Sequence, residues 1–376
     1  MRPPTPPRPR QNKMHTTLPI TRRLTRQIQV GPVAVGGMAP ISVQTMTKTD
    51  TRNVAATVAQ IREIESAGCD IVRLAVIDED AARALEAIRR EVKIPLVADI
   101  HFNHKLALIA LEAGIDGLRI NPGNIGGLDR VREVVKAAGP RQVPIRIGVN
   151  AGSLEKELLE KHGGATAAAL VESAMRHVRI LEDAGHPWIK ISVKASDVPR
   201  TLQAYRLLSK TTDHPLHLGV TEAGTLLNGT IRSSVALGML IAEGIGDTLR
   251  VSLTDHPVQE IRVGLELLRC LGLRPPGASV ISCPTCGRIQ IDVVSLAQRV
   301  EAELDQYYRA NPTAPHPAIA VMGCVVNGPG EAREADIAIA GGQGKAALYV
   351  RGAFLATVPE AEILDRLMEQ VKTWRD

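Results

Sequence analysis

Eight short aliphatic runs alternate with longer amphipathic segments between residues 40 and 272, and few folds accommodate that pattern. The runs cover residues 40–46, 70–76, 94–100, 117–123, 143–149, 188–194, 215–221 and 248–253. In the segments between them, apolar residues recur every three or four positions, and several segments end in glycine, as helices do. Eight strand-then-helix units predict a closed (β/α)8 barrel, the TIM barrel, which takes about 250 residues. A doubly wound sheet would use similar units, but eight of them without a glycine-rich dinucleotide turn favour closure.

The segments on either side of this repeat predict the domain organisation. Residues 28–37 (IQVGPVAVGG) predict a small hairpin that closes the bottom of the barrel. Residues 274–279 (RPPGAS) break the pattern and predict a domain boundary. Beyond it we expect a small α/β domain that ends in an amphipathic helix over 359–374. The whole chain is thus predicted to be α/β, with a leader over residues 1–20, a TIM-barrel domain over 21–273 and a second domain over 274–376.

The charge of the chain is concentrated at its beginning. Residues 1–29 hold seven basic and no acidic residues, which leaves 38 basic against 40 acidic residues in the rest. The body therefore lacks the basic surface of a nucleic-acid-binding protein, and aromatic residues, at 2%, are too scarce for base stacking. The Pro/Arg-rich leader is predicted to be disordered and lacks the apolar run of a secretory signal. We expect a cytoplasmic protein that binds neither nucleic acid nor membranes.

Basic residues lie within or at the end of five predicted strands, where a barrel is normally apolar. They are Arg73, Arg119, Arg146, Lys194 and Arg250. A buried unpaired charge costs several kcal/mol, so these residues need either carboxylate partners, such as Asp99 or Asp116, or an anionic ligand. Because the carboxyl ends of barrel strands converge on the mouth where active sites lie, we interpret them as a phosphate or diphosphate site.

Polar and acidic residues in the adjoining loops extend this predicted site. Side chains that could bind substrate oxygens follow three of the cations: Asn121, Asn124, Asn150, Ser153 and Ser252. Glu222 ends the seventh run and could transfer a proton, or serve as a counter-ion for Lys194 or Arg250. Asp99 and His101 follow the third run and could do proton chemistry or position the cations.

Three of the five cysteines lie in the second domain: Cys283, Cys286 and Cys324. Without an export signal, a metal or redox role explains them better than disulfides do. A structural zinc site would need a fourth ligand, and only His316 is nearby. An iron–sulfur cubane can be held by three thiolates and one weak, exchangeable ligand, for which Glu331 is a candidate. The other two cysteines are expected to be buried in helices: Cys69 and Cys270.

Several longer stretches extend these motifs and carry a family resemblance. They include VADIHF, LRINPGNIG, IRIGVNAGSLEK, ESAMRH, SVKASD, LHLGVTEAG, CPTCGR and GCVVNGPGEA. In these stretches the chain closely resembles the 4-hydroxy-3-methylbut-2-en-1-yl diphosphate synthase family of the non-mevalonate isoprenoid pathway. The resemblance runs from about residue 20 to the end, and the last two stretches together are highly specific. It implies a TIM barrel followed by a [4Fe–4S] domain, in the short two-domain bacterial arrangement.

The resemblance also implies an activity and a set of partners. The substrate would be 2-C-methyl-D-erythritol 2,4-cyclodiphosphate, opened and dehydrated by two electrons to 4-hydroxy-3-methylbut-2-en-1-yl diphosphate. The cluster ligands would be Cys283, Cys286, Cys324 and Glu331, and Glu222 would be the acidic group near the reacting carbons. The residues that cradle the diphosphate would be Arg73, Arg119, Arg146, Lys194, Arg250 and Ser252. Flavodoxin or ferredoxin would supply the electrons, and two chains would form a homodimer in which each cluster covers the partner's barrel mouth.

Two other hypotheses fit parts of the sequence. One is a zinc-dependent TIM-barrel lyase or transferase that acts on a phosphorylated substrate. The other is an electron carrier or iron–sulfur scaffold with a vestigial barrel, although a carrier has no need of five cations at strand ends.

Overall fold

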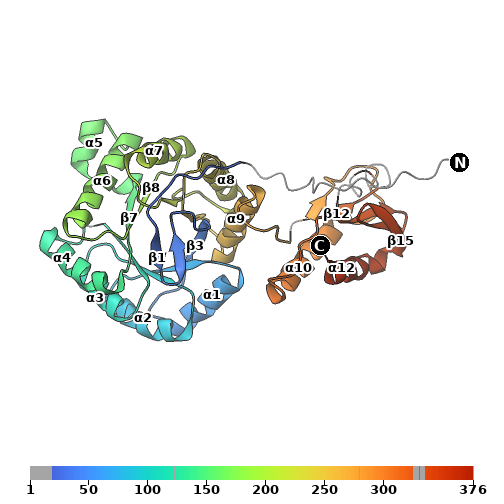
Figure 1. Ribbon diagram of the computed structural model, residues 1–376, viewed down its shortest axis with the longest axis horizontal. Helices are drawn as coiled ribbons and strands as arrows, with labels where there is room; N and C mark the ends of the chain where they lie inside the picture. Colours follow the sequence, from blue (N-terminus) through green and yellow to red (C-terminus); the bar gives the residue numbers. More distant parts are fainter. Residues whose placement is uncertain (1–18, 122, 279, 325–329, 331–334, 376) are drawn as a thin grey trace. The chain divides into compact units, whose positions relative to one another are not determined.

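The computed structural model describes residues 19–121, 123–278, 280–324, 330 and 335–375. The chain divides into two compact units, one spanning Pro19–Leu273 and one from Arg274 onward (Figure 1). Two predictions fall outside the described residues: the disordered leader, apart from residues 19 and 20, and the weak cluster ligand Glu331.

Eight parallel strands form the first unit's barrel, as predicted. They are β3 (Ser42–Met46), β4 (Ile71–Ala75), β5 (Leu96–Asp99), β6 (Gly117–Ile120), β7 (Ile145–Asn150), β8 (Ile189–Lys194), β9 (His217–Leu218) and β10 (Thr248–Leu249). Their order is β8-β7-β6-β5-β4-β3-β10-β9, and a parallel bridge between Ile191 and Leu216 brings β9 back beside β8. The last two strands are shorter than predicted, and at the start of the seventh run Pro215 has no N–H to give to the ladder.

Helices surround this barrel between successive strands (Figure 1). They are α1 (Val54–Ser66), α2 (Glu79–Glu91), α3 (His104–Glu112), α4 (Gly127–Ala138), α5 (Lys156–His162), α6 (Ala167–Asp183), α7 (Val198–Thr211), α8 (Leu226–Ala242) and α9 (Pro257–Cys270). Several begin at a residue whose side chain accepts a hydrogen bond from the first turn, as Asn53, Asp78 and Asp197 do. Their apolar faces pack on the strands and form one continuous aliphatic core.

A two-stranded hairpin closes one end of the barrel, as the sequence predicted. Strands β1 (Ile28–Val30) and β2 (Val33–Val35) pair antiparallel. Their buried side chains pack with Ile71 and Val97, which lie at or near the amino ends of β4 and β5. The active-site end of the barrel is therefore the opposite, carboxyl end.

The interior of the barrel is polar. Along β7, Ile145, Ile147 and Val149 belong to the core between strands and helices. Side chains alternate along a strand, so Arg146 and Gly148 face the barrel interior. By the same alternation, β8 presents three polar side chains to the interior: Lys190, Ser192 and Lys194.

The second unit is a five-stranded sheet covered by two helices. Its strands are β11 (Val280–Ser282), β12 (Ile319–Met322), β13 (Ile337–Gly342), β14 (Lys345–Val350) and β15 (Ala353–Pro359), in that order. The first three are parallel and the last two antiparallel. Helices α10 (Val293–Ala310) and α12 (Ile363–Thr373) pack on the sheet around a small apolar core. Among the described residues, none of the helices combines the length and hydrophobicity needed to span a bilayer.

Candidate functional site

The five predicted cations come together inside the barrel, most of them toward the carboxyl ends of their strands, although Arg146 is the second residue of β7. Each lies in or directly after a different strand, and four of the five are at least nine-tenths buried: Arg73, Arg119, Arg146 and Lys194. Arg250 is half-buried and follows β10. The positive charges of these side chains act on one another across the barrel, so the five form one electrostatic group.

Asp99 at the end of β5 lies between two of these cations. Its carboxylate is 3.6 Å from Arg73 Nε and 3.4 Å from Arg119 Nη1. Burial alone would raise the pKa of Asp99, but the charges of Arg73 and Arg119 and the ring of His101, whose Nε2 lies 3.6 Å from Oδ1, hold it well below its usual range. Two of the five cations, Arg73 and Arg119, therefore have a carboxylate partner, which is Asp99. The other carboxylate that the sequence offered, Asp116, lies just before β6 and pairs with Arg89 instead.

The other three cations form no ion pair within the described part of the chain. Arg146 Nη1 donates a hydrogen bond to Ser192 Oγ at 2.9 Å, while its Nε is buried without an acceptor. Burial, together with the neighbouring arginine charges, lowers the pKa of Arg146 and of Lys194 well below the ordinary values. Burial and the charge of Arg73 lower the pKa of Arg250 to about 10. These shifts mark uncompensated positive charge, which an anion of more than one charge would stabilise.

The backbone of Gly148 fixes the position of Arg119. Arg119 Nη2 donates to the Gly148 carbonyl oxygen at 3.0 Å, and Asn121 Oδ1 accepts from the Gly148 N–H at 3.1 Å. A Cβ atom on Gly148 would lie 2.8 Å from Arg119 Nε. The ends of β6 and β7 are therefore joined through one glycine, with Asn121 buried beside the cation it follows in sequence.

A cavity of about 300 Å³ opens beside Arg250, the one of the five cations that is among its lining residues. Met46, Glu222, Arg250 and Ser252 are among its lining residues. Asn150, at the end of β7, is half-buried and is not among them. The structure thus brings Glu222 and Ser252 together with Arg250, as the sequence suggested.

Glu222 is exposed and has a left-handed backbone, with φ of 52°. A residue with a Cβ adopts this conformation at a cost of roughly 1 kcal/mol, so its surroundings must impose it. The preceding Thr221 N–H is bound to the Ala195 carbonyl oxygen at 3.1 Å, and the Thr254 N–H to that of Gly224 at 3.0 Å. Within the described residues Glu222 forms no ion pair, so it does not act as a counter-ion for Lys194 or Arg250.

Sequence reasoning missed several polar residues of the barrel interior. Met46 Sδ lies 3.0 Å from Arg73 Nη2 and 4.0 Å from Arg250 Nη1. Lys190 Nζ, the Gln44 amide and His217 Nε2 are buried without a hydrogen-bond partner among the described residues. Burial and the charge of Arg146 lower the pKa of Lys190 to about 7. Strict alternation within WIKISVK was the signal that could have placed Lys190 inside the barrel with Lys194.

In the second unit, two adjacent parallel strands carry the clustered cysteines. Cys283 follows β11 and Cys324 lies two residues beyond β12, and these strands pair in register from Val280 with Ile319. The Cys283 Sγ accepts a hydrogen bond from the Gly323 N–H at 3.4 Å. Hydrogen bonds from the backbone and side chain of Arg288 lower the pKa of Cys286.

This environment suits thiolate ligands. N–H groups directed at sulfur stabilise the ionised form, as they do around iron–sulfur clusters. Among the described residues, no group of three His, Cys, Asp or Glu side chains could hold a metal ion. In a cubane the thiolates bind different iron atoms, and so lie farther apart than the ligands of one ion. The three cysteines therefore fit a cluster by donor type and by their shared sheet edge, while the fourth ligand, Glu331, lies outside the described residues.

The remaining cysteines differ from each other. Cys69 is buried, as expected, and burial raises the pKa of its thiol to about 12, but it lies three residues after the end of α1, so the expectation that it lies in a helix was wrong. Cys270 is the last residue of α9 and is exposed, so the expectation that it is buried was wrong. The amphipathic pattern did not determine which face of the last helical turn it occupies.

Two family models match the chain: the GcpE TIM-barrel domain over residues 25–265 and the GcpE protein C-terminal domain over residues 279–373. A protein of Geobacter sulfurreducens is 60% identical over 93% of this chain and 97% of its own length. One of Thermodesulfovibrio yellowstonii is 54% identical over 94% of this chain and 99% of its own. Both are named 4-hydroxy-3-methylbut-2-en-1-yl diphosphate synthase (flavodoxin). Among solved structures, the dihydropteroate synthase of Stenotrophomonas maltophilia matches 67% of this chain and all of its own, with 14% identity and a TM-score of 0.49.

Proposed function

This chain belongs to the GcpE family, and we propose that it is a flavodoxin-dependent 4-hydroxy-3-methylbut-2-en-1-yl diphosphate synthase of isoprenoid biosynthesis. Its substrate is 2-C-methyl-D-erythritol 2,4-cyclodiphosphate, whose ring is opened and which loses water on taking up two electrons. The observation that supports this most strongly is the group of five cations at the barrel mouth, three of which have no carboxylate partner among the described residues.

The diphosphate is the part of the substrate that these cations bind. Arg119 and Arg73 already share Asp99, so they are held in place before the substrate arrives. Arg146, Lys194 and Arg250 supply the positive charge that the phosphate oxygens neutralise. Asn121, Asn150 and Ser252 add hydrogen bonds from the neighbouring loops. Binding through fixed cations orients the substrate ring, so the entropy cost of aligning the ring is met on binding and does not add to the barrier of the reaction.

The cluster site lies in the second unit. Cys283, Cys286, Cys324 and Glu331 would hold a [4Fe–4S] cluster, and Glu331 is the weak ligand. When bound, such a cluster supplies single-electron transfer and Lewis acidity at its open iron. The hydrogen bond from the Gly323 N–H to Cys283 Sγ holds that side chain in place, and the hydrogen bonds from Arg288, which lower the pKa of Cys286, favour the thiolate of Cys286.

Glu222 is the group that moves a proton near the reacting carbons. It is exposed and lines the same cavity as Arg250 and Ser252. An unpaired carboxylate at the rim can exchange protons with water and with a bound substrate. Glu222 has a left-handed backbone conformation that its surroundings impose. Strained backbone of this kind is common at functional sites.

The remaining assignments complete the proposal. Flavodoxin is the electron donor, in keeping with the relatives' names, and ferredoxin is the other candidate. The protein acts in the cytoplasm as a homodimer, with one chain's cluster covering the other chain's barrel mouth. The zinc-dependent alternative is not favoured, because neither relative carries a zinc enzyme's name.

The test is to purify the full chain without oxygen and to measure iron, acid-labile sulfide and zinc. About four irons and four sulfides per chain are expected, together with turnover of the cyclic diphosphate when reduced flavodoxin is added. Zinc without sulfide would overturn the reductive mechanism. A full cluster without turnover of this substrate would instead overturn the substrate assignment.

A further inference from the structure

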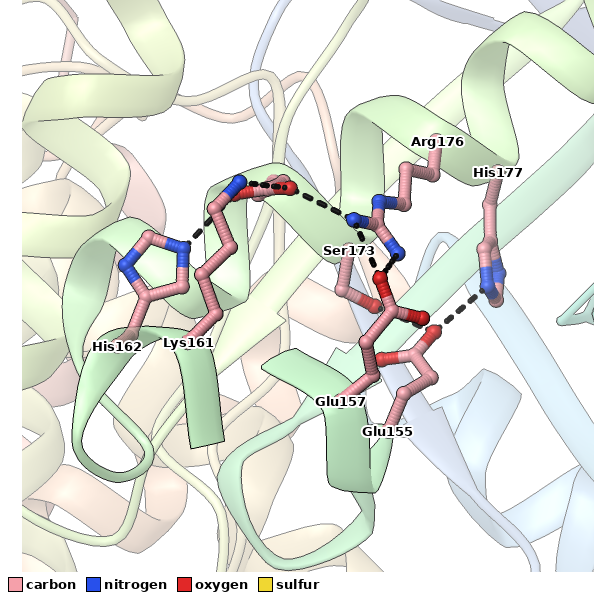
Figure 2. Close-up of polar contacts among 8 residues, drawn as sticks. Glu155, Glu157, Lys161, His162, Ser173, Arg176 and His177 are labelled. Carbon is pink, nitrogen blue, oxygen red and sulfur yellow. Dashed lines mark hydrogen bonds and ion pairs between the residues drawn. The ribbon is translucent and has the colours of Figure 1, made fainter. Parts of the chain in front are cut away.

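Two polar clusters join α5 to α6 beside the barrel mouth (Figure 2). The first, the Glu155 cluster, consists of Glu155, Ser173 and His177. The second, the Glu172 cluster, consists of Glu157, Lys161, His162, Glu172 and Arg176. Both link the same pair of segments, but only the first lies against the loops that carry the proposed substrate-binding residues.

The Glu155 cluster is centred on one carboxylate oxygen. Glu155 Oε1 accepts hydrogen bonds from Ser173 Oγ and from His177 Nε2, each at 3.0 Å. Ser173 and His177 are 2% and 5% exposed, so both donors are shielded from water. Burial lowers the pKa of His177 despite the opposing charge of Glu155, which favours a neutral ring with the proton on Nε2. A buried hydrogen bond to a carboxylate is strong, and breaking it leaves its partner unsatisfied.

The same histidine supports the loop after β6. A Cβ atom on Gly123 would lie 3.0 Å from His177 Nε2, so this loop passes directly over the ring. The loop carries Asn121, whose Oδ1 binds the Gly148 N–H of β7. Through the same Nε2, His177 holds Glu155, which lies in the loop after β7 and immediately precedes α5. One side chain of α6 therefore contacts the loops that follow two neighbouring strands.

We propose that Glu155 and His177 are positioning residues that hold the loops after β6 and β7 in the arrangement that binds the diphosphate substrate. This inference rests on the proposed function, because the proposed ligand Asn121 lies on the loop after β6 and the proposed ligand Asn150 ends β7, directly before the second loop. Neither residue contacts the reacting atoms. Their loss weakens substrate binding because Asn121 and Asn150 must then be ordered by the substrate itself.

The Glu172 cluster supplies a matched control. Glu172 binds Lys161 Nζ, His162 Nε2 and Arg176 Nη2, each at 2.8 Å. It joins α5 to α6 as the Glu155 cluster does, and its charge network is larger. The atoms nearest to a Cβ added on Gly123 belong to His177, and those nearest to one on Gly148 belong to Arg119, not to a member of this cluster. A role limited to fastening the two helices predicts equal effects in both clusters, whereas a positioning role predicts an effect from the Glu155 cluster alone.

The experiment compares four variants with wild type, each of them prepared with its iron–sulfur cluster. In Glu155→Ala and His177→Leu, the KM for the cyclic diphosphate should rise about tenfold while kcat stays within about twofold. Glu155→Gln keeps an acceptor oxygen for both donors and should restore KM to within about threefold of wild type. Glu172→Ala should leave KM unchanged. An unchanged KM in Glu155→Ala, or an equal rise in Glu172→Ala, would overturn the proposal. Ser173→Ala, which removes only one of the two bonds, replaces Glu155→Ala if that variant fails to fold.

A second measurement separates this inference from the substrate assignment. Hydrogen exchange without substrate should be faster in the loops over 121–127 and 148–154 in Glu155→Ala than in Glu172→Ala. If wild type does not turn over the cyclic diphosphate, the proposed function fails, yet this exchange pattern still supports the loop-positioning role. Equal exchange in the two variants would refute positioning even in an enzyme that is fully active.

Discussion

Arg119 donates a hydrogen bond to the Gly148 carbonyl oxygen at 3.0 Å, and only glycine leaves room for the guanidinium beside that backbone. The cation and the strand that supports it thus come from β6 and β7, which are neighbours in the sheet. This contact sets where positive charge is presented at the barrel mouth, and it leads to the first prediction.

Gly148→Ala should raise the KM for the cyclic diphosphate about tenfold, because the new Cβ would lie 2.8 Å from Arg119 Nε and displace the guanidinium. Iron and sulfide content should not change. Gly139→Ala is the control, since no atom lies within 4 Å of its added Cβ and its φ is helical at −57°. The measurement is the steady-state KM of the two variants for the cyclic diphosphate. Equal KM values would show that Arg119 is not held by this contact.

Arg119→Ala should weaken substrate binding by about 10- to 100-fold, the cost of losing a charged hydrogen-bonding group. The cluster should remain intact, because Arg119 belongs to the first unit. Arg89→Ala is the control. It removes an arginine that pairs with Asp116 at 2.8 Å, and this aspartate lies just before β6, away from the mouth. It should lower stability without raising KM. Loss of iron in Arg119→Ala would contradict the assignment of this residue to substrate binding.

Glu222→Gln should lower kcat by about 100-fold with little change in KM, because the amide cannot transfer a proton while its size is preserved. Single-turnover and steady-state rates with reduced flavodoxin provide the measurement. Glu243→Gln, which removes an exposed carboxylate paired with Arg206 on the outer helices, is the comparison. Turnover of Glu222→Gln at the wild-type rate would exclude proton transfer by this side chain.

Replacing any of Cys283, Cys286 and Cys324 by serine should remove most of the iron and sulfide from protein prepared without oxygen. Cys270→Ser should retain both, since this exposed thiol lies at the end of α9 in the first unit. Glu331→Gln should keep part of the iron but lose most turnover, as expected for a weak ligand. Full cluster content in any of the three cysteine variants would remove that residue from the ligand set.

The buried Lys190 predicts a dependence of stability on pH. Burial and the charge of Arg146, opposed by Asp247, lower its pKa from 10.5 to about 7. Between these values the unfolded chain binds a proton that the folded chain does not, so the Lys190 contribution to stability increases as pH rises. Lys190→Met removes this term, and its stability relative to wild type should fall by about 3 kcal/mol between pH 7 and pH 9.5.

Thermal unfolding of the two proteins in parallel at both pH values tests this expectation. Groups away from Lys190 titrate alike in wild type and variant, so the change in the difference between their midpoints reports on Lys190 and the groups that its charge acts on, such as His217. A difference that stays constant with pH would mean that Lys190 is protonated in the folded barrel throughout this range.

The barrel and its mouth were predictable because each strand carries its own signal. Aliphatic runs of the right length gave eight strands, and a basic residue within or after such a run marked the mouth. Pairings across strands were less accessible: Asp99 could be named as a partner, but its place between Arg73 and Arg119 depends on register. Lys190 and His217 were missed because a polar residue within an apolar run was not assigned to a face. Alternation within WIKISVK puts Lys190 on the same face as Lys194, but it does not say whether that face is the barrel interior or the helix layer. Strand register, which arises only when the sheet closes, decides between the two.

The hairpin formed by β1 and β2 determines how material can enter and leave the barrel. Its apolar side chains pack with Ile71 and Val97, so this end is sealed by a dry layer. Substrate, product, water and protons must all use the opposite rim. Whatever covers that rim during turnover therefore controls the exchange of substrate, product, water and protons with solvent, because the barrel interior is accessible from one end only.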